Sequence, residues 1–320
     1  MSETSNLPTA ASGFLAKQRQ NWNAFYFRPG SPVALGALRI IFFACVIGLF
    51  VIFDPLNRWN ASTVQPQTYR PIGLLDWTNA PLMSQSRVDV LFGVFVVGNV
   101  LAMVGLLTRT SAMLAGLTGL YLYAMPSSFG KVGHGNMLLL FTTFTFALSR
   151  AGDALSFDAI ISRLRGKTPP GWAKEYRSGE YTWPIRTVWL FMTLIFFATG
   201  IAKLRWGGYD WLFTPHLAST IRQHYLLPGG AAPSSQIGLW IAQFEWLCIA
   251  TAWLTVFVEL FFPLALLNKW GRLFFPTAMF CLQFGIGWSM GIFFWTFFIG
   301  YVFWLPWELV GRRRQLTATI

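Results

Sequence analysis

Long apolar segments alternate with short polar ones along most of the 320-residue chain. An apolar run of about 20 residues can cross the hydrocarbon core of a membrane as a helix. Run length and flanking charge predict eight such helices, over residues 33–53, 88–107, 110–126, 134–149, 185–204, 238–267, 271–288 and 290–309. The last two form one apolar stretch, which we divide at Gly285, Gly287, Ser289 and Gly291 because small residues suit a tight reversal. The pattern predicts an all-α polytopic integral membrane helix bundle.

The polar segments define the remaining organisation. Residues 14–30 mix aromatic side chains with Lys and Arg, which predicts an N-terminal helix lying flat at the membrane interface. We therefore expect three parts. They are an N-terminal cytoplasmic or interfacial segment (1–32), a transmembrane domain (33–309) and a basic cytoplasmic tail (310–320).

Composition and charge support this interpretation. Only 11% of the residues are charged, against about 25% in soluble domains, and 54% are hydrophobic. The net charge of +12 would fit a nucleic-acid binder, but Lys and Arg also collect in the cytoplasmic loops of membrane proteins. With a cytoplasmic N-terminus, sixteen of the 24 basic residues fall inside and seven outside. We expect both termini in the cytoplasm, in a bacterial inner membrane or its equivalent, with membrane lipid rather than nucleic acid as partner.

Familiar soluble-enzyme motifs are missing from the sequence. Cys45, Cys248 and Cys281 all lie in apolar runs and form neither a disulfide framework nor a metal-ligand pattern. There is no P-loop, no HExxH and no GxGxxG after a strand. We expect no bound metal.

Ionisable residues inside apolar spans are costly and indicate function or pairing. Arg39 lies about two turns into the first span, and Glu259 lies on the inner half of the sixth. Because the two positions fall at similar depth, we predict that they form a structural ion pair.

His134 and Lys203 form a second candidate group. His134 opens the inward fourth span and Lys203 closes the outward fifth, so both fall near the outer face. A partly desolvated Lys can act as a base, and a nearby His can relay its proton. Trp206, Tyr209 and Trp211 follow closely and could form the apolar wall that binds a flat ring. Topology alone favours a structural interpretation, with Lys203 as an interfacial anchor and His134 as a helix-start residue.

Four stretches resemble a known membrane family. They are Phe27-Arg28-Pro29 through Leu38-Arg39-Ile40, the span from His134 that ends in Leu155-Ser156-Phe157-Asp158, Thr199-Gly200-Ile201-Ala202-Lys203-Leu204, and Ser289-Met290-Gly291-Ile292-Phe293. Their order and spacing resemble the HTTM (horizontally transferred transmembrane domain) family, which is related to the membrane part of vitamin K-dependent gamma-carboxylase.

The resemblance implies a chemistry. The position of Lys203 matches the base that deprotonates the hydroquinone, and that of His134 matches its assistant, so the implied cofactor is a quinone, a hydroquinone or another lipid. The chain departs from the carboxylase in two ways. It has Met279 to Gln283 where the carboxylase has a His early in its penultimate apolar segment, and we expect no large lumenal domain after Arg314. Peptide carboxylation is therefore not expected.

Two functions of different kinds stay open. One is a membrane enzyme with carboxylase-like or quinol-type chemistry on a lipid-soluble substrate. The other is a non-catalytic membrane subunit or scaffold that packs against other membrane proteins. A transporter would call for matching broken helices or an internal repeat, which the sequence lacks. The discriminating observation is whether Lys203 faces a closed pocket shared with His134 or faces lipid.

Overall fold

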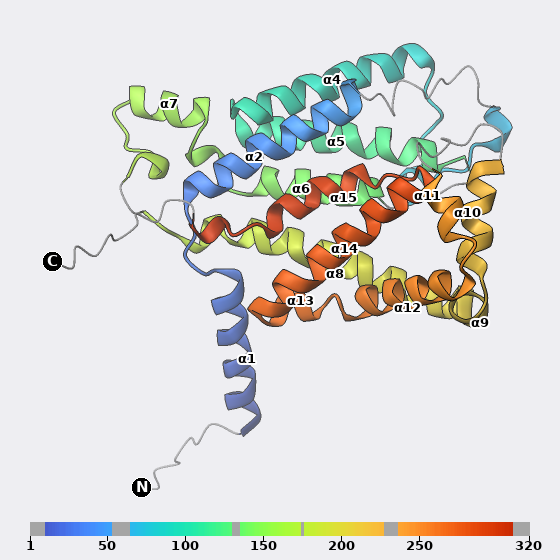
Figure 1. Ribbon diagram of the computed structural model, residues 1–320. Coiled ribbons are helices and arrows are strands. Elements are labelled where there is room, and N and C mark those ends of the chain that lie inside the picture. The colour runs from blue at the N-terminus through green and yellow to red at the C-terminus, as the bar shows by residue number, and fades with distance from the viewer. Residues whose placement is uncertain (1–9, 53–64, 130–134, 174–175, 227–235, 310–320) are drawn as a thin grey trace, which may run out of the picture.

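The computed structural model describes residues 10–52, 65–129, 135–173, 176–226 and 236–309 (Figure 1). Every regular element in these ranges is helical, with one isolated β-bridge between Gly30 and Ser178. The expected all-α class is confirmed for this part of the chain. The expected basic tail (310–320) lies outside it.

Eight helices of 14 to 22 residues make up most of the structure. They are α1 (Ala10–Tyr26), α2 (Pro32–Ile47), α4 (Gln85–Val104), α5 (Thr108–Ser127), α6 (Gly135–Leu148), α8 (Trp183–Ala202), α12 (Glu245–Phe261) and α14 (Lys269–Met290). The shorter α-helices are α3 (Leu74–Trp77), α7 (Phe157–Leu164), α9 (Gly208–Phe213), α10 (His216–Leu226), α11 (Ile237–Ile241), α13 (Leu264–Leu267) and α15 (Trp295–Tyr301). Two π-helical turns, η1 (Gly48–Ile52) and η6 (Lys203–Gly207), continue α2 and α8. The 3₁₀ turns are η2 (Pro66–Thr68), η3 (Ala151–Asp153), η4 (Pro170–Trp172), η5 (Gly179–Tyr181), η7 (Val302–Trp304) and η8 (Trp307–Leu309).

The long helices pack side by side into a bundle. Helix α4 packs against α2 and α5, α5 against α6, and α6 against α8 and α15. Helix α12 contacts both α8 and α14. In Figure 1, α7 lies at one end of the bundle and α9, α10 and α11 lie at the other, while α1 projects away from it. One end of the bundle is therefore built around α7, and the other around α9, α10 and α11.

Four helical segments in the described residues are long and apolar enough to cross a membrane. They are Pro32–Val51, Gln85–Val104, Gly179–Phe213 and Lys269–Met290. Two further apolar helices, Gly135–Leu148 and Trp295–Trp304, are shorter. The first of these measures about 21 Å, less than the roughly 30 Å of a hydrocarbon core. Length and composition thus support a membrane protein with transmembrane helices.

Phenylalanine rings fill the centre of the bundle. Phe42 and Phe43 on α2 contact Phe146 on α6, and Phe303 in η7 contacts both Phe42 and Phe146, with ring centroids 5.1–6.2 Å apart. All four rings are at most 1% exposed. Tilted and edge-on ring contacts of this kind stabilise packing where lipid, rather than water, surrounds a helix.

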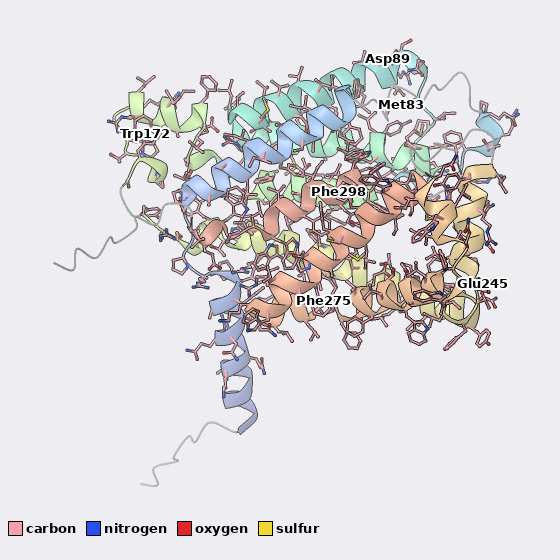
Figure 2. All side chains as sticks on the ribbon, viewed as in Figure 1. Met83, Asp89, Trp172, Glu245, Phe275 and Phe298 are labelled. Atoms are coloured by element: carbon pink, nitrogen blue, oxygen red, sulfur yellow. The ribbon has the colours of Figure 1, made fainter. Side chains whose placement is uncertain are left out.

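The structure places two of the breaks between helices differently from the prediction. The segment predicted as one helix over 238–267 is divided, because α11 ends at Ile241 and α12 begins at Glu245. The final apolar stretch reverses only at Gly291, whose φ of +73° suits glycine. The other small residues chosen as the division point, Gly285, Gly287 and Ser289, are helical. Figure 2 shows Phe298 on α15 beside α14, and its ring lies 5.3 Å from that of Phe280.

Candidate functional site

Lys203 and Glu259 form a close ion pair inside the bundle. The ammonium Nζ of Lys203 lies 2.5 Å from Oε1 and 2.6 Å from Oε2 of Glu259. The Glu259 side chain is 4% exposed and that of Lys203 is 23% exposed. Taking two charges out of water costs several kcal/mol per ion, which only close contact offsets. The Lys203 ammonium and the Glu259 carboxylate therefore stabilise each other in their charged forms.

Helix continuation explains why these residues meet. The predicted end of the fifth span at residue 204 is wrong, because η6 and α9 continue the helical path to Phe213. Lys203 consequently lies within a candidate span rather than at its outer end. Gly200, one turn earlier, brings α8 close to α12, since a Cβ there would lie 3.1 Å from the Cβ of Glu259. Lys203 opens a π-turn, a feature that is frequent at functional sites.

The structure corrects the expected partner of Glu259. Its carboxylate pairs with Lys203, and the predicted ion pair with Arg39 is not formed. The prediction compared the depth of Arg39 in the first span with that of Glu259 in the sixth, and the sixth span is divided in the structure. The break before Glu245 and the continuation beyond Lys203 both change which polar residues share a level.

Arg39 is held by backbone carbonyls instead of a carboxylate. Its Nη1 donates to the carbonyls of Ala151 (2.7 Å) and Ala154 (3.5 Å), and its Nη2 donates to that of Leu155 (2.5 Å). The residue is 0% exposed. A Cβ at Gly105 would lie 2.7 Å from Nη1, so the end of α4 closes over the guanidinium. We name Arg39 with these carbonyls the Arg39 clamp.

The Leu155–Asp158 stretch completes this clamp. Ser156 caps the start of α7 with its hydroxyl oxygen. The carboxylate of Asp158 accepts hydrogen bonds from the backbone N–H groups of Leu107 and Thr108, both at 2.8 Å, and from the Thr108 hydroxyl. It thereby satisfies N–H groups at the start of α5 that have no partner within the helix. This stretch, which contributed to the family resemblance, joins α2, α4, α5 and α7.

The three aromatic residues after Lys203 separate in the structure. Trp206 is 78% exposed and Tyr209 is 71% exposed, so the prediction that they wall a pocket is wrong. Trp211 does lie beside the pair, with its ring centre 5.8 Å from the Lys203 ammonium. Of the three predicted residues, only Trp211 therefore accompanies the pair, at a distance suited to a cation–π contact.

His134, the expected partner of Lys203, lies outside the residues that the structure describes. A different histidine, His216, is exposed at the start of α10, and its ring centre lies 5.3 Å from that of Trp211. His216 was not among the residues singled out from the sequence.

Within the described ranges, no cluster of three or more His, Cys, Asp or Glu residues could hold a metal ion. Comparisons with known protein families, with curated proteins and with solved structures give no match to the chain. The geometry and chemistry of the sites themselves therefore indicate the function.

Proposed function

We propose that this chain is an HTTM-like integral membrane enzyme that removes a proton from a lipid-soluble, quinol-type substrate, with Lys203 and Glu259 as its acid–base pair. The carrying observation is the direct contact of these two side chains between apolar helices. An intramembrane ionisable pair indicates a functional site by default. Lys203 is the more accessible partner and is the group that would meet the substrate.

The pair can act as a base, and its net charge rises from zero to one when it takes up the substrate proton. One Nζ proton moves across the short hydrogen bond to the Glu259 carboxylate, which leaves a neutral amine and a neutral acid. The amine then accepts the phenolic proton of the substrate. The products are an ammonium on Lys203, a protonated Glu259 and a phenolate, so each proton is accounted for. The ammonium stabilises the phenolate by direct charge contact.

Nearby residues have supporting parts in this proposal. Trp211 supplies an apolar face beside the amine, on which the substrate ring stacks. His134, by the family resemblance, assists the proton transfer. Trp206 and Tyr209 face outward and have no part in holding the substrate.

The proposed topology has eight membrane crossings with both termini in the cytoplasm of a bacterial inner membrane. The sixteen-to-seven charge bias supports this orientation. Helix α1 carries aromatic and basic residues and projects from the bundle, which suits a position at the interface. Alkaline phosphatase fused after Ile320 should be inactive. An active, exported fusion would refute the orientation.

Oxygen uptake with menadiol as the probe tests the enzyme proposal. The ionised hydroquinone reduces oxygen faster than the neutral form, in the balanced reaction menadiol + O₂ → menadione + H₂O₂. Nanodiscs holding the protein should consume oxygen faster than empty nanodiscs. Lys203→Arg keeps a cation beside Glu259 but removes the exchangeable amine, because a guanidinium does not lose its proton in proteins. This variant should stay folded and lose the acceleration.

One observation favours the alternative, a non-catalytic membrane subunit. Both oxygens of Glu259 are engaged by one ammonium, as in a purely structural pair. Exposed aromatic residues such as Trp206 could then contact another membrane protein. If Lys203→Arg keeps full oxygen uptake, or if the wild type never exceeds empty nanodiscs, the enzyme proposal fails and this alternative remains.

A further inference from the structure

A second site lies at the end of the bundle where α2, α8 and α14 begin. A cavity of about 280 Å³ opens there, between the starts of these helices and the segment that follows η7. The described residues that line it include four cations and one acid, namely Arg28, Arg186, Lys269, Arg272 and Glu308. The cavity therefore has a formal excess of three positive charges, unlike the neutral Lys203–Glu259 pair.

The acid in this cavity is already occupied. Glu308 accepts from Arg186 Nη2 at 3.0 Å through Oε1, and its Oε2 lies 3.4 Å from Nη1 of Arg28. Within the described part of the chain, no carboxylate lies within ion-pair distance of Arg272. The positive charge of the cavity is thus only partly neutralised.

Arg186 has donors with no acceptor. It is 3% exposed, yet its Nε and Nη1 have no hydrogen-bond partner among the described residues, and the same is true of Nε of Arg272. A buried donor left without an acceptor costs about 1–3 kcal/mol, and more for a charged group. An anion that accepts from these donors would remove that cost.

Aromatic packing fixes the two guanidinium groups close to each other. The guanidinium carbons of Arg186 and Arg272 lie 3.9 and 4.9 Å from the ring centre of Trp189. That ring stacks on Trp304 at 4.5 Å, and its indole N–H donates to the carbonyl of Phe303. Two cations are thus held against one rigid ring, an arrangement that favours an anion with several acceptor oxygens.

We infer that this cavity binds a phosphate group, with Arg186 and Arg272 as its ligands. Guanidinium groups match the oxygens of a phosphate in paired hydrogen bonds. The stacked indoles and Leu273 give the cavity an apolar wall, which suits an amphiphile whose headgroup carries the phosphate. Basic pockets between transmembrane helices are known to take anionic lipid headgroups. The inference does not depend on the acid–base role of Lys203.

Thermal unfolding in nanodiscs tests the site and separates two sources of phosphate. The full-length chain is placed in phosphatidylcholine nanodiscs. Either phosphatidylglycerol is then added to the bilayer, or inorganic phosphate is added to the buffer at constant ionic strength. Stabilisation by phosphatidylglycerol alone would identify a lipid headgroup. Stabilisation by inorganic phosphate as well would show that the phosphate group suffices.

Arg272→Gln is the diagnostic variant, because Arg272 is less buried than Arg186 and, unlike Arg186, forms no ion pair with a described residue. Losing one charge-assisted hydrogen bond should weaken binding about tenfold or more. Arg165→Gln is the matched control, since Arg165 is exposed beside α7 and does not line the cavity. The inference is overturned if neither phosphatidylglycerol nor phosphate stabilises the wild type, or if both variants lose the same affinity.

Discussion

Two buried arginines show how differently this bundle treats a positive charge. Arg39 and Arg186 are 0% and 3% exposed; Arg39 lies in the middle of α2 and Arg186 in the first turn of α8. Both Nη atoms of Arg39 donate to carbonyls of residues 151–155, and only its Nε lacks an acceptor. Arg186 has one acceptor, Glu308, and leaves Nε and Nη1 without one.

The difference separates a structural role from a binding role. The fold supplies carbonyl acceptors to both Nη groups of Arg39 and leaves only its Nε without one. Arg186 faces a cavity with surplus positive charge and has donors to spare. The Lys203–Glu259 pair is intermediate, because its charges are matched internally while one partner stays partly accessible. Unsatisfied or accessible charge, rather than burial alone, distinguishes the candidate sites from the clamp.

The largest loss of stability is expected from breaking the Lys203–Glu259 ion pair. Glu259→Leu should destabilise the protein by roughly 3–5 kcal/mol, because it leaves Lys203 charged and without its partner between apolar helices. The double variant Lys203→Met, Glu259→Leu should recover most of that loss, since neither charge remains. A double-mutant cycle of unfolding free energies in detergent measures this. If the losses caused by Lys203→Met and Glu259→Leu simply add in the double variant, the two side chains do not interact directly.

Arg39→Met should lower the free energy of unfolding by roughly 3 kcal/mol, somewhat less than Glu259→Leu does. The substitution leaves the buried carbonyl of Ala151 and the partly buried carbonyl of Leu155 without these donors. Arg165→Met is the control, since that side chain is exposed, and should change little. An unchanged melting temperature for Arg39→Met would refute the clamp.

Arg186→Met sharpens the comparison with Arg39 most directly. In phosphatidylcholine we expect the free energy of unfolding to fall by only about 1 kcal/mol. The main interactions of the Arg186 side chain are the hydrogen bond to Glu308 and the contact with Trp189. A loss equal to that of Arg39→Met would show that Arg186 is also a structural clamp. The unfolding free energies of both variants should be measured under identical conditions.

The smallest effect is expected at the exposed aromatics. Trp206→Leu and Tyr209→Leu should each change stability by less than about 0.5 kcal/mol and leave menadiol-dependent oxygen uptake unchanged. Trp211→Leu, the matched substitution beside Lys203, should lower uptake. Equal effects of all three substitutions on uptake would contradict the separation of these residues.

The sequence predicted the positions of the helices better than the side-chain contacts between them. Apolar run length placed the starts and ends of α2, α4, α5 and α14 within a few residues, because span length is a local property. It missed the helical continuation through Lys203-Leu204-Arg205-Trp206, where polar and glycine residues resemble a loop. It also missed the break before Glu245. Both errors shift depth by several residues, so the partner of Glu259 was wrongly chosen.

The phosphate cavity could not be predicted in the same way. Its charged lining comes from residues around 28, 186, 272 and 308, which only the packing of three helix starts and the segment after η7 brings together. In the sequence these arginines counted merely as cytoplasmic charge. Their lack of acceptors is a three-dimensional property that no spacing reveals.

The most direct test of the central claim is menadiol-dependent oxygen uptake by the double variant Lys203→Met, Glu259→Leu in nanodiscs. This variant removes the acid–base pair while leaving no unpaired charge, so its fold should survive. The double variant should melt close to the temperature of the wild type and take up oxygen no faster than empty nanodiscs. Wild-type uptake by a folded double variant would contradict the central claim.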